Sequence, residues 1–493
     1  MNIIVLEHPR MYSEKHFNDI ANTPLWSCLI SGYCAAALIK DGHDVHLMDA
    51  AGNGWDFKRT QDEILNADPE ILCINTVFFW EHTPLFFNFL SNLRQKGFNG
   101  HINLFGFFPT LAWEIIFSLT KAVDSVALGE CENTLAELAK HLETGKNWKH
   151  ISGLAFHEKN SIQTSGHRSP ASNLDDFAFP KRHNSKDTAS VLASRGCYNQ
   201  CSFCPVPSFY NQGPLWRGRT PENVFSELSI LAKNGTEDIY FVDPNFIGPG
   251  SKGRQRAIEL AQLIKPLKIS FGMETRPNDL DAQTIEQLAQ AGLKSLLIGI
   301  ENVSFSVLNK LNKHSSINVS ERAIKLCRAA GIDPEIGFLM FVPDSCIEDI
   351  NQNFDFLLRN NLLNRLDKTA NLLSHYQIVL YGTTGYRYFK KQKRLIKTDA
   401  TGFQHEISYK DKRVEWMASV IVPFCHYILK EMGQKDSPLY WNKKNTARFA
   451  DTNNLIVDIF KKTLEIIKNK TNLPNVESVK KNALNELKTI TGI

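Results

Sequence analysis

Three cysteines lie close together near the middle of the chain, at Cys197, Cys201 and Cys204. Cysteine thiolates are the usual protein ligands of iron–sulfur clusters, and one loop with this spacing can supply three of them. A four-iron cube held by three thiolates keeps one iron open, as a catalytic metal site keeps an open coordination position. The alternative is that these thiols are buried core residues or form disulfides. The spacing favours the cluster.

The composition is that of an ordinary globular protein of 493 residues, with 43% hydrophobic and 22% charged residues. This length suffices for two or three domains. The 56 basic and 52 acidic residues are too balanced to indicate a nucleic acid or an anionic membrane as partner. Ten cysteines are too few for a disulfide scaffold and indicate a reducing compartment. No signal peptide and no apolar stretch of about 18 residues is found, so we expect a cytoplasmic protein without membrane contact.

The cysteine loop must be positioned by the segment 188–390, in which strand-like and helix-like stretches alternate. This pattern predicts a full or partial (β/α) barrel with its chemistry at the carboxyl ends of the strands. The stretch Ala189–Ser194 is the strand that delivers the cysteines, and Leu372–Leu380 is predicted as the last strand. Polar side chains follow the strands between these two, at Asp243, Asn245, Glu274, Arg276 and Glu301. A carboxylate there can hold an ammonium group or a ribose, and an arginine can clamp a carboxylate; solvated rim charges are the alternative.

Residues 1–150 show the same alternation and predict a Rossmann-like parallel sheet with helices on both faces. The predicted strands are Ile3–Leu6, Asp44–Met48, Ile71–Thr76, Ile102–Phe105 and Ser125–Leu128. Ligands of such sheets bind beyond the carboxyl ends of the strands. The loops expected there, 76–80 and 106–110, are unusually aromatic. Aromatic residues on one edge indicate a broad flat ligand or a domain interface, with core packing as the alternative.

The remaining segments carry less chemical information. Residues 151–187 are predicted to be a linker, and residues 391–493 a small, mostly helical domain that caps the barrel mouth and the substrate. The fold class is therefore α/β, with three domains. The basic run 390–394 is expected to be a solvated face. Cys327, Cys346 and Cys425 are isolated, which argues against a second cluster.

The motifs together resemble those of the cobalamin-dependent radical S-adenosylmethionine (SAM) enzymes, in which a B12-binding domain precedes a radical SAM core. The resemblance is carried by Cys-x3-Cys-x2-Cys after an apolar strand, by Thr275-Arg276, and by Gly299-Ile300-Glu301-Asn302. In the first domain it is carried by Gly106-x-x-Pro-Thr110 and Gly129-Glu130-x-Glu132. The chain departs from the family pattern where Phe105 and Phe108 replace a glycine and a histidine, and where Phe341 or Val342 replaces a glycine.

The resemblance implies three cofactors and a set of residues for each. The [4Fe-4S] cluster would be held by Cys197, Cys201 and Cys204. SAM would be contacted by Phe203, Asp243, Asn245, Glu274, Arg276, Glu301 and Phe341. Cobalamin would be contacted by Thr76, Val77, Phe78, Phe79, Trp80, Gly106, Phe107, Phe108, Pro109, Gly129, Glu130 and Glu132.

A second cobalamin signature, Asp-x-His-x-x-Gly, supplies a histidine to the cobalt. The nearest string begins at Asp41 and has His46 in place of the glycine. It also lies at the start of a strand, so we interpret His43 as a solvated turn residue. The resemblance therefore implies cobalamin without a protein histidine on cobalt, its lower face meeting a side chain of loop 76–80.

The activity implied by the resemblance is reductive cleavage of SAM to a 5′-deoxyadenosyl radical, which removes a hydrogen atom from a small-molecule or peptide substrate. Methylation of an unactivated carbon from methylcobalamin is the first hypothesis. A non-methylating cyclisation or ring rearrangement is the second, and a corrinoid and cluster sensor without catalysis is the third. A reductant such as flavodoxin or ferredoxin is the expected protein partner, and the sequence does not identify the substrate or a catalytic residue.

Overall fold

The first half of the chain is built around a seven-stranded sheet with the strand order β2-β1-β3-β4-β5-β6-β7. A computed structural model describes residues 1–11, 29–159, 161–182, 189–210, 215–443, 446–469 and 472–492. The pairs among the first five strands are parallel, and β6 and β7 add an antiparallel hairpin. The strands are β1 (Asn2–Glu7), β2 (Asp44–Asp49), β3 (Ile71–Asn75), β4 (His101–Phe105), β5 (Ser125–Ala127), β6 (Leu154–Glu158) and β7 (Ser161–Thr164).

Helices cover both faces of this sheet because its strands are apolar on both sides. In β1, Ile4 and Leu6 face one core while Ile3 and Val5 face the other. The helices of the first core are α2 (Phe57–Ala67), α3 (Thr83–Gln95) and α4 (Phe107–Leu119), and those of the second are α1 (Leu29–Lys40) and α5 (Glu132–Glu143). Buried parallel strands read as continuous apolar runs for this reason. All five predicted strands are present.

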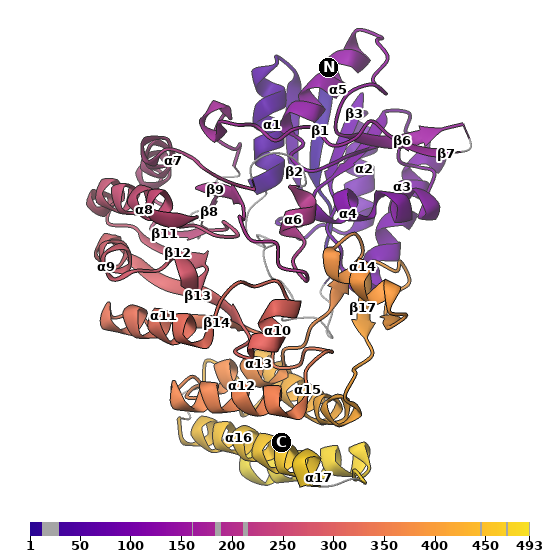
Figure 1. The fold of residues 1–493 in the computed structure, drawn as a ribbon. Coiled ribbons are helices and arrows are strands. Elements are labelled where there is room, and N and C mark those ends of the chain that lie inside the picture. Colours follow the sequence, from indigo (N-terminus) through magenta and orange to yellow (C-terminus); the bar gives the residue numbers. More distant parts are fainter. Residues whose placement is uncertain are drawn as a thin grey trace.

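The central part of the chain forms an open, five-stranded parallel sheet of order β14-β13-β12-β11-β8. Its strands are β8 (Ala189–Val191), β11 (Asp238–Phe241), β12 (Ser270–Thr275), β13 (Leu293–Glu301) and β14 (Glu335–Phe338). The helices α7 (Pro221–Lys233), α8 (Gly250–Ile264), α9 (Ala282–Ala291) and α11 (Ile317–Ala329) follow the strands and lie along the outer side of the curved sheet (Figure 1). The predicted α/β class with a partial barrel is confirmed.

The predicted last strand, Leu372–Leu380, is wrong over most of its length. Residues Leu366–Ser374 form helix α13, and only Val379–Leu380 is a strand, β15. The apolar residues Leu366, Ala370 and Leu373 recur at helical spacing and are buried, which a strand would not allow. This helix packs against α15 (Lys412–Gly433) and α16 (Thr446–Asn469).

The C-terminal residues divide between two places (Figure 1). The helices α15, α16 and α17 (Val476–Thr491) share one hydrophobic core with the central sheet and with α12 (Ile347–Arg359). A small antiparallel sheet, β15-β17-β16, lies apart from them near the first domain, with helix α14 (Thr384–Lys391) beside it. Its other strands are β16 (Leu395–Lys397) and β17 (Gln404–Ile407). None of the helices among the described residues is long and apolar enough to cross a membrane.

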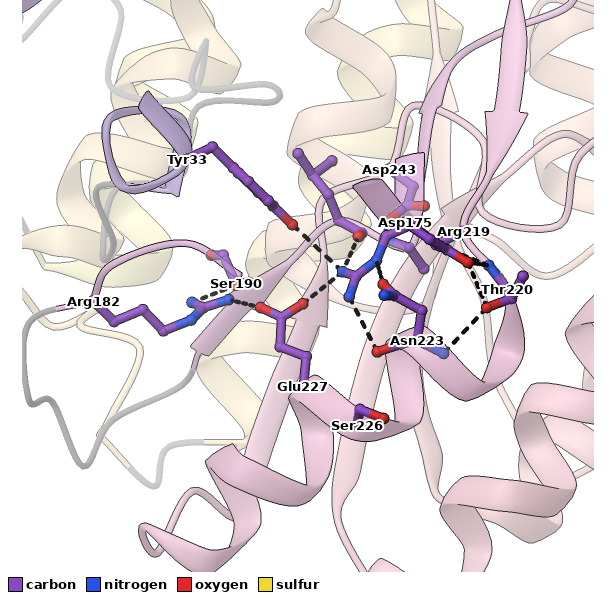
Figure 2. A network of polar contacts seen from close by, with 12 residues as sticks. Tyr33, Asp175, Arg182, Ser190, Arg219, Thr220, Asn223, Ser226, Glu227 and Asp243 are labelled. Atoms are coloured by element: carbon purple, nitrogen blue, oxygen red, sulfur yellow. Dashed lines mark hydrogen bonds and ion pairs between the residues drawn. The ribbon is translucent and has the colours of Figure 1, made fainter. Parts of the chain in front are cut away.

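A buried polar network joins the first domain, the connector and the central domain (Figure 2). Glu227 of α7 accepts hydrogen bonds from Arg182 Nη2 at 2.6 Å and from Arg219 Nη1 at 2.5 Å. Arg219 Nη1 also lies 3.4 Å from the hydroxyl of Tyr33 on α1. The connector is fixed a second time, because the hydroxyl of Thr220 donates to Asp175 at 2.6 Å. The position of the two sheets is thus set by specific bonds on both sides of the connector.

The glycine before the first cysteine of the loop offers a test of the local fold. Gly196 has φ +78°, and a Cβ there would lie 1.7 Å from the carbonyl oxygen of Leu215. We expect Gly196→Ala to lower the free energy of unfolding by at least about 2 kcal/mol, because it adds a backbone clash to left-handed strain. Urea unfolding of the apoprotein measures this. Gly433→Ala is the matched control, since no atom lies within 4 Å of its Cβ. Equal midpoints for the two variants would contradict the expectation.

Candidate functional site

The three cysteines share one loop at the carboxyl end of β8. The loop starts at β9 (Ser194–Gly196), which pairs with β10 (Trp216–Gly218), and ends at the short helix α6 (Val206–Phe209). All three cysteines are partly exposed. The backbone N–H of Cys204 donates to the carbonyl of Cys201 at 3.2 Å, so the last two ligands sit on one tight turn. The loop is accessible and is held at both ends by regular structure.

Burial favours the neutral form of two of the thiols, and nearby positive charges oppose this effect. Burial raises the pKa of Cys197, and the positive charges of Arg276 and Lys313 act to lower it. Burial also raises the pKa of Cys204, with further contributions from Cys201 and Cys197. The three thiols are therefore close enough for their charges to interact. Nδ2 of Asn199 donates to Sγ of Cys201 at 2.9 Å, a hydrogen bond of the kind that tunes cluster thiolates.

The donor set fits a cluster and not a single ion. In the part of the chain that the structure describes, no three His, Cys, Asp or Glu side chains are gathered closely enough to hold one metal ion. A four-iron cube binds each thiolate at a separate iron, so its ligands are spread further apart than those of one ion. Three partly exposed thiols on one loop, with two cations facing them, meet that requirement.

Arg276 and Lys313 connect two of the predicted strand ends beside this loop. Nη2 of Arg276 donates to the carbonyl of Lys313 at 2.6 Å, and Nζ of Lys313 pairs with Glu301 at 2.9 Å. Burial alone would lower the pKa of Lys313, but Glu301 and Cys201 raise it above its ordinary value. Nε of Arg276 is buried without a hydrogen-bond partner among the described residues. This unpartnered donor fits the carboxylate of a bound amino acid. The polar stretch around Lys313 gave no sequence signal for its role.

Asp243 and Asn245 have partners inside the protein. Asp243 is fully buried and accepts hydrogen bonds from Ala193 N at 3.0 Å and Ser194 Oγ at 2.5 Å. Nδ2 of Asn245 donates to Asp279 at 2.8 Å, and its Oδ1 accepts from Thr275 Oγ1 at 3.0 Å. These side chains hold the base of the cysteine loop and the end of β12 in place. Both side chains therefore already have partners within the protein, and their contact with SAM stays a prediction.

Glu274 has a different environment from the other predicted carboxylates. Burial raises its pKa to about 7, although a hydrogen bond from Tyr240 opposes the shift and the charges of Glu301 and Asp243 add to it. The hydroxyl of Tyr240 is 3.4 Å away, and no described residue forms a salt bridge with Glu274. It is thus a carboxyl group inside the barrel that changes charge near neutral pH.

The two predicted aromatic contacts to SAM lie in different places. Phe203 is partly exposed within the cysteine loop and packs against Val307, Leu311 and Val342. Phe341 is fully buried and faces Phe460 of α16, with 6.4 Å between ring centroids. The side chain of Phe341 therefore belongs to the core shared with the C-terminal helices.

The predicted cobalamin loops meet at one edge of the first sheet. Gly106 has φ +112°, and a Cβ there would lie 2.6 Å from Oδ1 of Asn75, so a side chain is not accommodated. The hydroxyl of Thr110 donates to the carbonyl of Gly106 at 2.7 Å and accepts from the N–H of Gly129 at 3.0 Å. Thr76 N donates to the carbonyl of Phe105 at 2.9 Å. The three predicted segments are thus linked by direct bonds among Thr76, Phe105, Thr110 and Gly129, and Pro109 is buried.

The aromatic residues of these loops pack against later parts of the chain. Phe78 and Phe108 each contact the ring of Phe403, at centroid distances of 4.9 and 4.7 Å. Nε1 of Trp80 donates to Gln404 Oε1 at 2.8 Å. The small sheet β15-β17-β16 therefore covers loop 76–80. Phe79 is buried instead beside His8, and Val77 donates its N–H to Nε2 of that histidine at 3.2 Å.

One aromatic contact joins the two predicted cofactor loops. Phe107, from loop 106–110, stacks on Phe209 with ring centroids 4.1 Å apart and an interplanar angle of 21°. The same small cluster contains Val206 and Tyr210, and Cys197 and Cys204 pack against it. The edge of the first sheet and the cysteine loop are consequently neighbours, although about 90 residues separate them in sequence.

Glu130 and Glu132 bind buried arginines of the central domain, and their contact with cobalamin stays a prediction. Arg195 on β9 pairs with Glu130 at 3.1 Å and with Glu132 at 2.6 Å, and Arg217 on β10 pairs with Glu130 at 2.7 Å. All four side chains are at most 7% exposed. Burial opposes ionisation of Glu130, but Arg195 and Arg217 hold its pKa below the usual value. The sequence predicts both glutamates as contacts to cobalamin and gives no sign of this ion-pair network between the domains.

Two histidines of the first domain differ from expectation. The interpretation of His43 as a solvated turn residue is wrong, since its side chain is 3% exposed and lies 3.9 Å from Glu143 at the end of α5. It precedes β2, at the edge of the sheet opposite the ligand loops.

His8 follows β1 at the edge of the sheet where the ligand loops lie, and burial lowers its pKa to about 3. Its Nδ1 bonds the carbonyl of Pro9 at 2.7 Å, so this ring supports loop 76–80 as a neutral side chain.

Comparison with known proteins agrees with this geometry. Residues 191–357 match the family model of the radical SAM superfamily. The chain is 26% identical to an uncharacterized methyltransferase, PH0819, of Pyrococcus horikoshii over 65% of this chain and 71% of that protein. It is 23% identical to the anaerobic magnesium-protoporphyrin IX monomethyl ester cyclase of Synechocystis over 87% of this chain and 86% of that protein. The resemblance of the central domain to radical SAM enzymes is confirmed.

A solved structure extends the comparison to the whole chain. The cobalamin-dependent SAM radical enzyme OxsB, with aqua-cobalamin bound, superposes with a TM-score of 0.78 at 18% identity. The match covers 100% of this chain and 80% of OxsB. The order of a Rossmann-like sheet, an open parallel barrel and C-terminal helices is therefore shared with this solved structure.

The interdomain network predicts a large loss of stability when one carboxylate is neutralised. We expect Glu130→Gln to lower the free energy of unfolding by about 3 kcal/mol, because Arg195 and Arg217 stay buried with less compensating charge. Urea unfolding of the apoprotein measures the loss. Glu335→Gln is the matched control, since it removes an exposed pair with Arg365 and should cost less than about 1 kcal/mol. Similar losses in the two variants would show that the network is not energetically coupled.

The raised pKa of Glu274 predicts a pH dependence of stability. The native state holds the proton more tightly than the unfolded state, whose ordinary value is 4.5. This contribution is present below pH 4.5 and is lost as the pH rises through about 7. Between about pH 5 and pH 8, we expect the parent to lose about 1–3 kcal/mol more than Glu274→Gln, whose amide does not titrate. Unfolding midpoints of both apoproteins at the two pH values test this, and parallel curves would contradict it.

Proposed function

We propose that this chain, which carries a radical SAM domain in the fold of the cobalamin-dependent members, is a cobalamin-dependent radical SAM enzyme that methylates an unactivated carbon. The observation that carries the proposal is the contact of Phe107 with the cluster of side chains around Cys197 and Cys204. It brings the edge where a tetrapyrrole would bind next to the loop where an iron–sulfur cube would bind. The two cofactors can then act on one substrate between them.

The cluster would be held by Cys197, Cys201 and Cys204, with Asn199 hydrogen-bonded to the middle sulfur. Lys313 and Arg276 stabilise the negative charge of the thiolates. The protein also restricts access of water, because Phe107, Phe209 and Tyr210 pack beside the loop. Such a hydrophobic shell controls the solvent access and the dielectric around a metal site.

The SAM site would lie between the cysteine loop and the ends of β12 and β13. Arg276 offers its unpartnered Nε to the carboxylate of SAM, and it is held by the carbonyl of Lys313 and by the ring of Tyr198, whose centroid is 5.0 Å away. Glu301, at φ +66°, is fixed by Lys313 and faces the same space. We assign Asp243 and Asn245 to support of this site.

The cobalamin site would lie along loops 76–80 and 106–110, beneath the small C-terminal sheet. Gly106 keeps the edge free of a side chain, and Phe78 and Trp80 supply flat apolar surface. The described residues of loop 76–80 contain no histidine. When bound, the cofactors supply the chemistry: the cluster and SAM generate the radical, and methylcobalamin supplies the methyl group.

The relatives support methyl transfer and also favour one alternative. The Pyrococcus relative is called a methyltransferase. The Synechocystis relative, which matches over most of both chains, is called a cyclase. A non-methylating ring closure is therefore the second candidate. In both cases the substrate would be a small molecule or a peptide and would bind between the barrel mouth and the small C-terminal sheet.

The cysteine assignment is tested by anaerobic reconstitution with iron, sulfide and cobalamin. We expect Cys201→Ala to lose the cluster absorbance and to lower formation of 5′-deoxyadenosine from SAM by at least about 1,000-fold, because cleavage needs the bound cluster. Cys346→Ala is the matched control, since this exposed cysteine is the N-cap of α12 and lies outside the cysteine loop. Retained activity in Cys201→Ala would refute the ligand assignment.

The same assay separates the candidate functions. Methyl transfer forms S-adenosylhomocysteine beside 5′-deoxyadenosine, because a second SAM must remethylate the corrinoid. A cyclase forms 5′-deoxyadenosine alone. Reduced protein that holds both cofactors and cleaves no SAM would support the sensor hypothesis and overturn the proposal.

A further inference from the structure

The surface beside the cysteine loop is basic, although the chain as a whole is nearly neutral. Residues 382–397 contain six Lys or Arg residues and no Asp or Glu. Residues 302–320, which flank the loop on its other side, also contain no carboxylate. The whole chain carries 56 basic and 52 acidic residues. Positive charge is therefore concentrated in the two segments that flank the cysteine loop.

Both segments touch the cysteine loop directly at Ser202, between the second and third cysteines. The N–H of Gly385, in the first turn of α14, donates to the carbonyl of Ser202 at 2.7 Å. The N–H of Ser202 donates to the carbonyl of Leu311 at 2.9 Å, and its hydroxyl donates to the carbonyl of Lys310 at 3.2 Å. Lys310 ends helix α10 (Phe305–Lys310), so the loop is clasped between α10 and α14.

One exposed face of α14 lies next to α10. Thr384, Arg387, Tyr388 and Lys391 are exposed and occupy helical positions i, i+3, i+4 and i+7. The hydroxyl of Tyr388 donates to Asp344 Oδ2 at 3.2 Å, and Nζ of Lys310 donates to the carbonyl of Asp344 at 3.2 Å. Asp344 itself is buried and paired with Arg394, so it does not neutralise this surface.

The face also has an apolar anchor and cations without acidic partners. Phe305, at the start of α10, is 73% exposed, and Tyr388 is 43% exposed. Arg387 donates only to the carbonyl of Gly382 and the hydroxyl of Thr384, both on its own segment. Within the described ranges, neither Arg387 nor Lys391 forms a salt bridge. Exposed aromatic residues among unpaired cations are suited to a negatively charged protein partner.

We propose that this α10–α14 face, made of Phe305, Lys310, Arg387, Tyr388 and Lys391, is the docking surface for a small acidic one-electron carrier protein that reduces the cluster. The inference rests on the proposed function, since it needs a cluster on the cysteine loop. A carrier bound here would place its redox centre beside Ser202. In this reaction one electron moves from the carrier to the cluster, so the carrier is oxidised by one electron and the cluster is reduced by one electron. No bond is formed or broken.

The test is the rate at which reduced flavodoxin passes an electron to the reconstituted full-length enzyme in an anaerobic stopped-flow experiment. We expect the charge-reversed variant Arg387→Glu/Lys391→Glu to react at least about tenfold more slowly at low ionic strength, and the parent's rate to fall with added salt while the variant's does not. Lys461→Glu/Lys481→Glu is the control. It makes the same change of charge on exposed residues of α16 and α17, far from the loop (Figure 1).

Dithionite, a small reductant that needs no docking surface, separates the two proposals. If dithionite produces no reduced-cluster signal in the parent by electron paramagnetic resonance, the proposed function fails. If dithionite reduces parent and variants alike and flavodoxin also reacts equally with all of them, the docking surface alone is overturned. The docking surface is also overturned if Arg387→Glu/Lys391→Glu and Lys461→Glu/Lys481→Glu both react slowly with flavodoxin. In that case the net charge of the protein, and not this face, sets the rate. Slow reaction in Arg387→Glu/Lys391→Glu alone supports the docking surface.

Discussion

The arrangement of the site depends on the buried ion pairs that Arg195 and Arg217 make with Glu130 and Glu132. The arginines belong to the hairpin that begins the cysteine loop, and the glutamates follow the fifth strand of the first sheet. Buried charges are costly unless their partners are well placed, so this set tolerates little relative movement of the two domains. The stacking of Phe107 on Phe209 joins the same two domains beside this network.

The hydrogen-bond network at the connector also restricts relative movement of the two domains. Glu227 is bonded by Arg182 and Arg219, and Arg219 reaches Tyr33 of the first domain. The segment between the domains is therefore part of the rigid structure at its described positions and not a loose tether. The first domain is therefore joined to the central one twice, by the arginine–glutamate pairs of the hairpin and by the contact of Arg219 with Tyr33.

Much of the fold could be read from the sequence because its signals are local. The strands of the first sheet are continuous apolar runs, and the spacing of the cysteines identifies their loop without any tertiary information.

The functional site was harder to predict from the sequence where it depends on contacts between distant segments. Glu130 and Glu132 lie in the expected loop, yet their partners are about 65 and 63 residues away, and no local pattern reveals such pairs. Lys313 follows a short helix in a polar stretch, and its pairing with Glu301 appears only when β13 and that stretch are folded together. The prediction of a strand over Leu372–Leu380 was wrong because the apolar residues of this stretch suit a strand or a helix equally. Packing against α15 and α16 decides in favour of the helix.

The cover over loop 76–80 has a consequence for how the protein is made. Trp80 and Gln404, which bond across it, are 324 positions apart, so ribosomal synthesis finishes the first sheet long before its lid exists. Domains near the amino terminus generally fold first during translation. The aromatic edge of this sheet is thus left bare on the growing polypeptide until Phe403 emerges. A corrinoid that binds at this edge would meet it uncovered during this interval and covered by Phe403 and Gln404 afterwards.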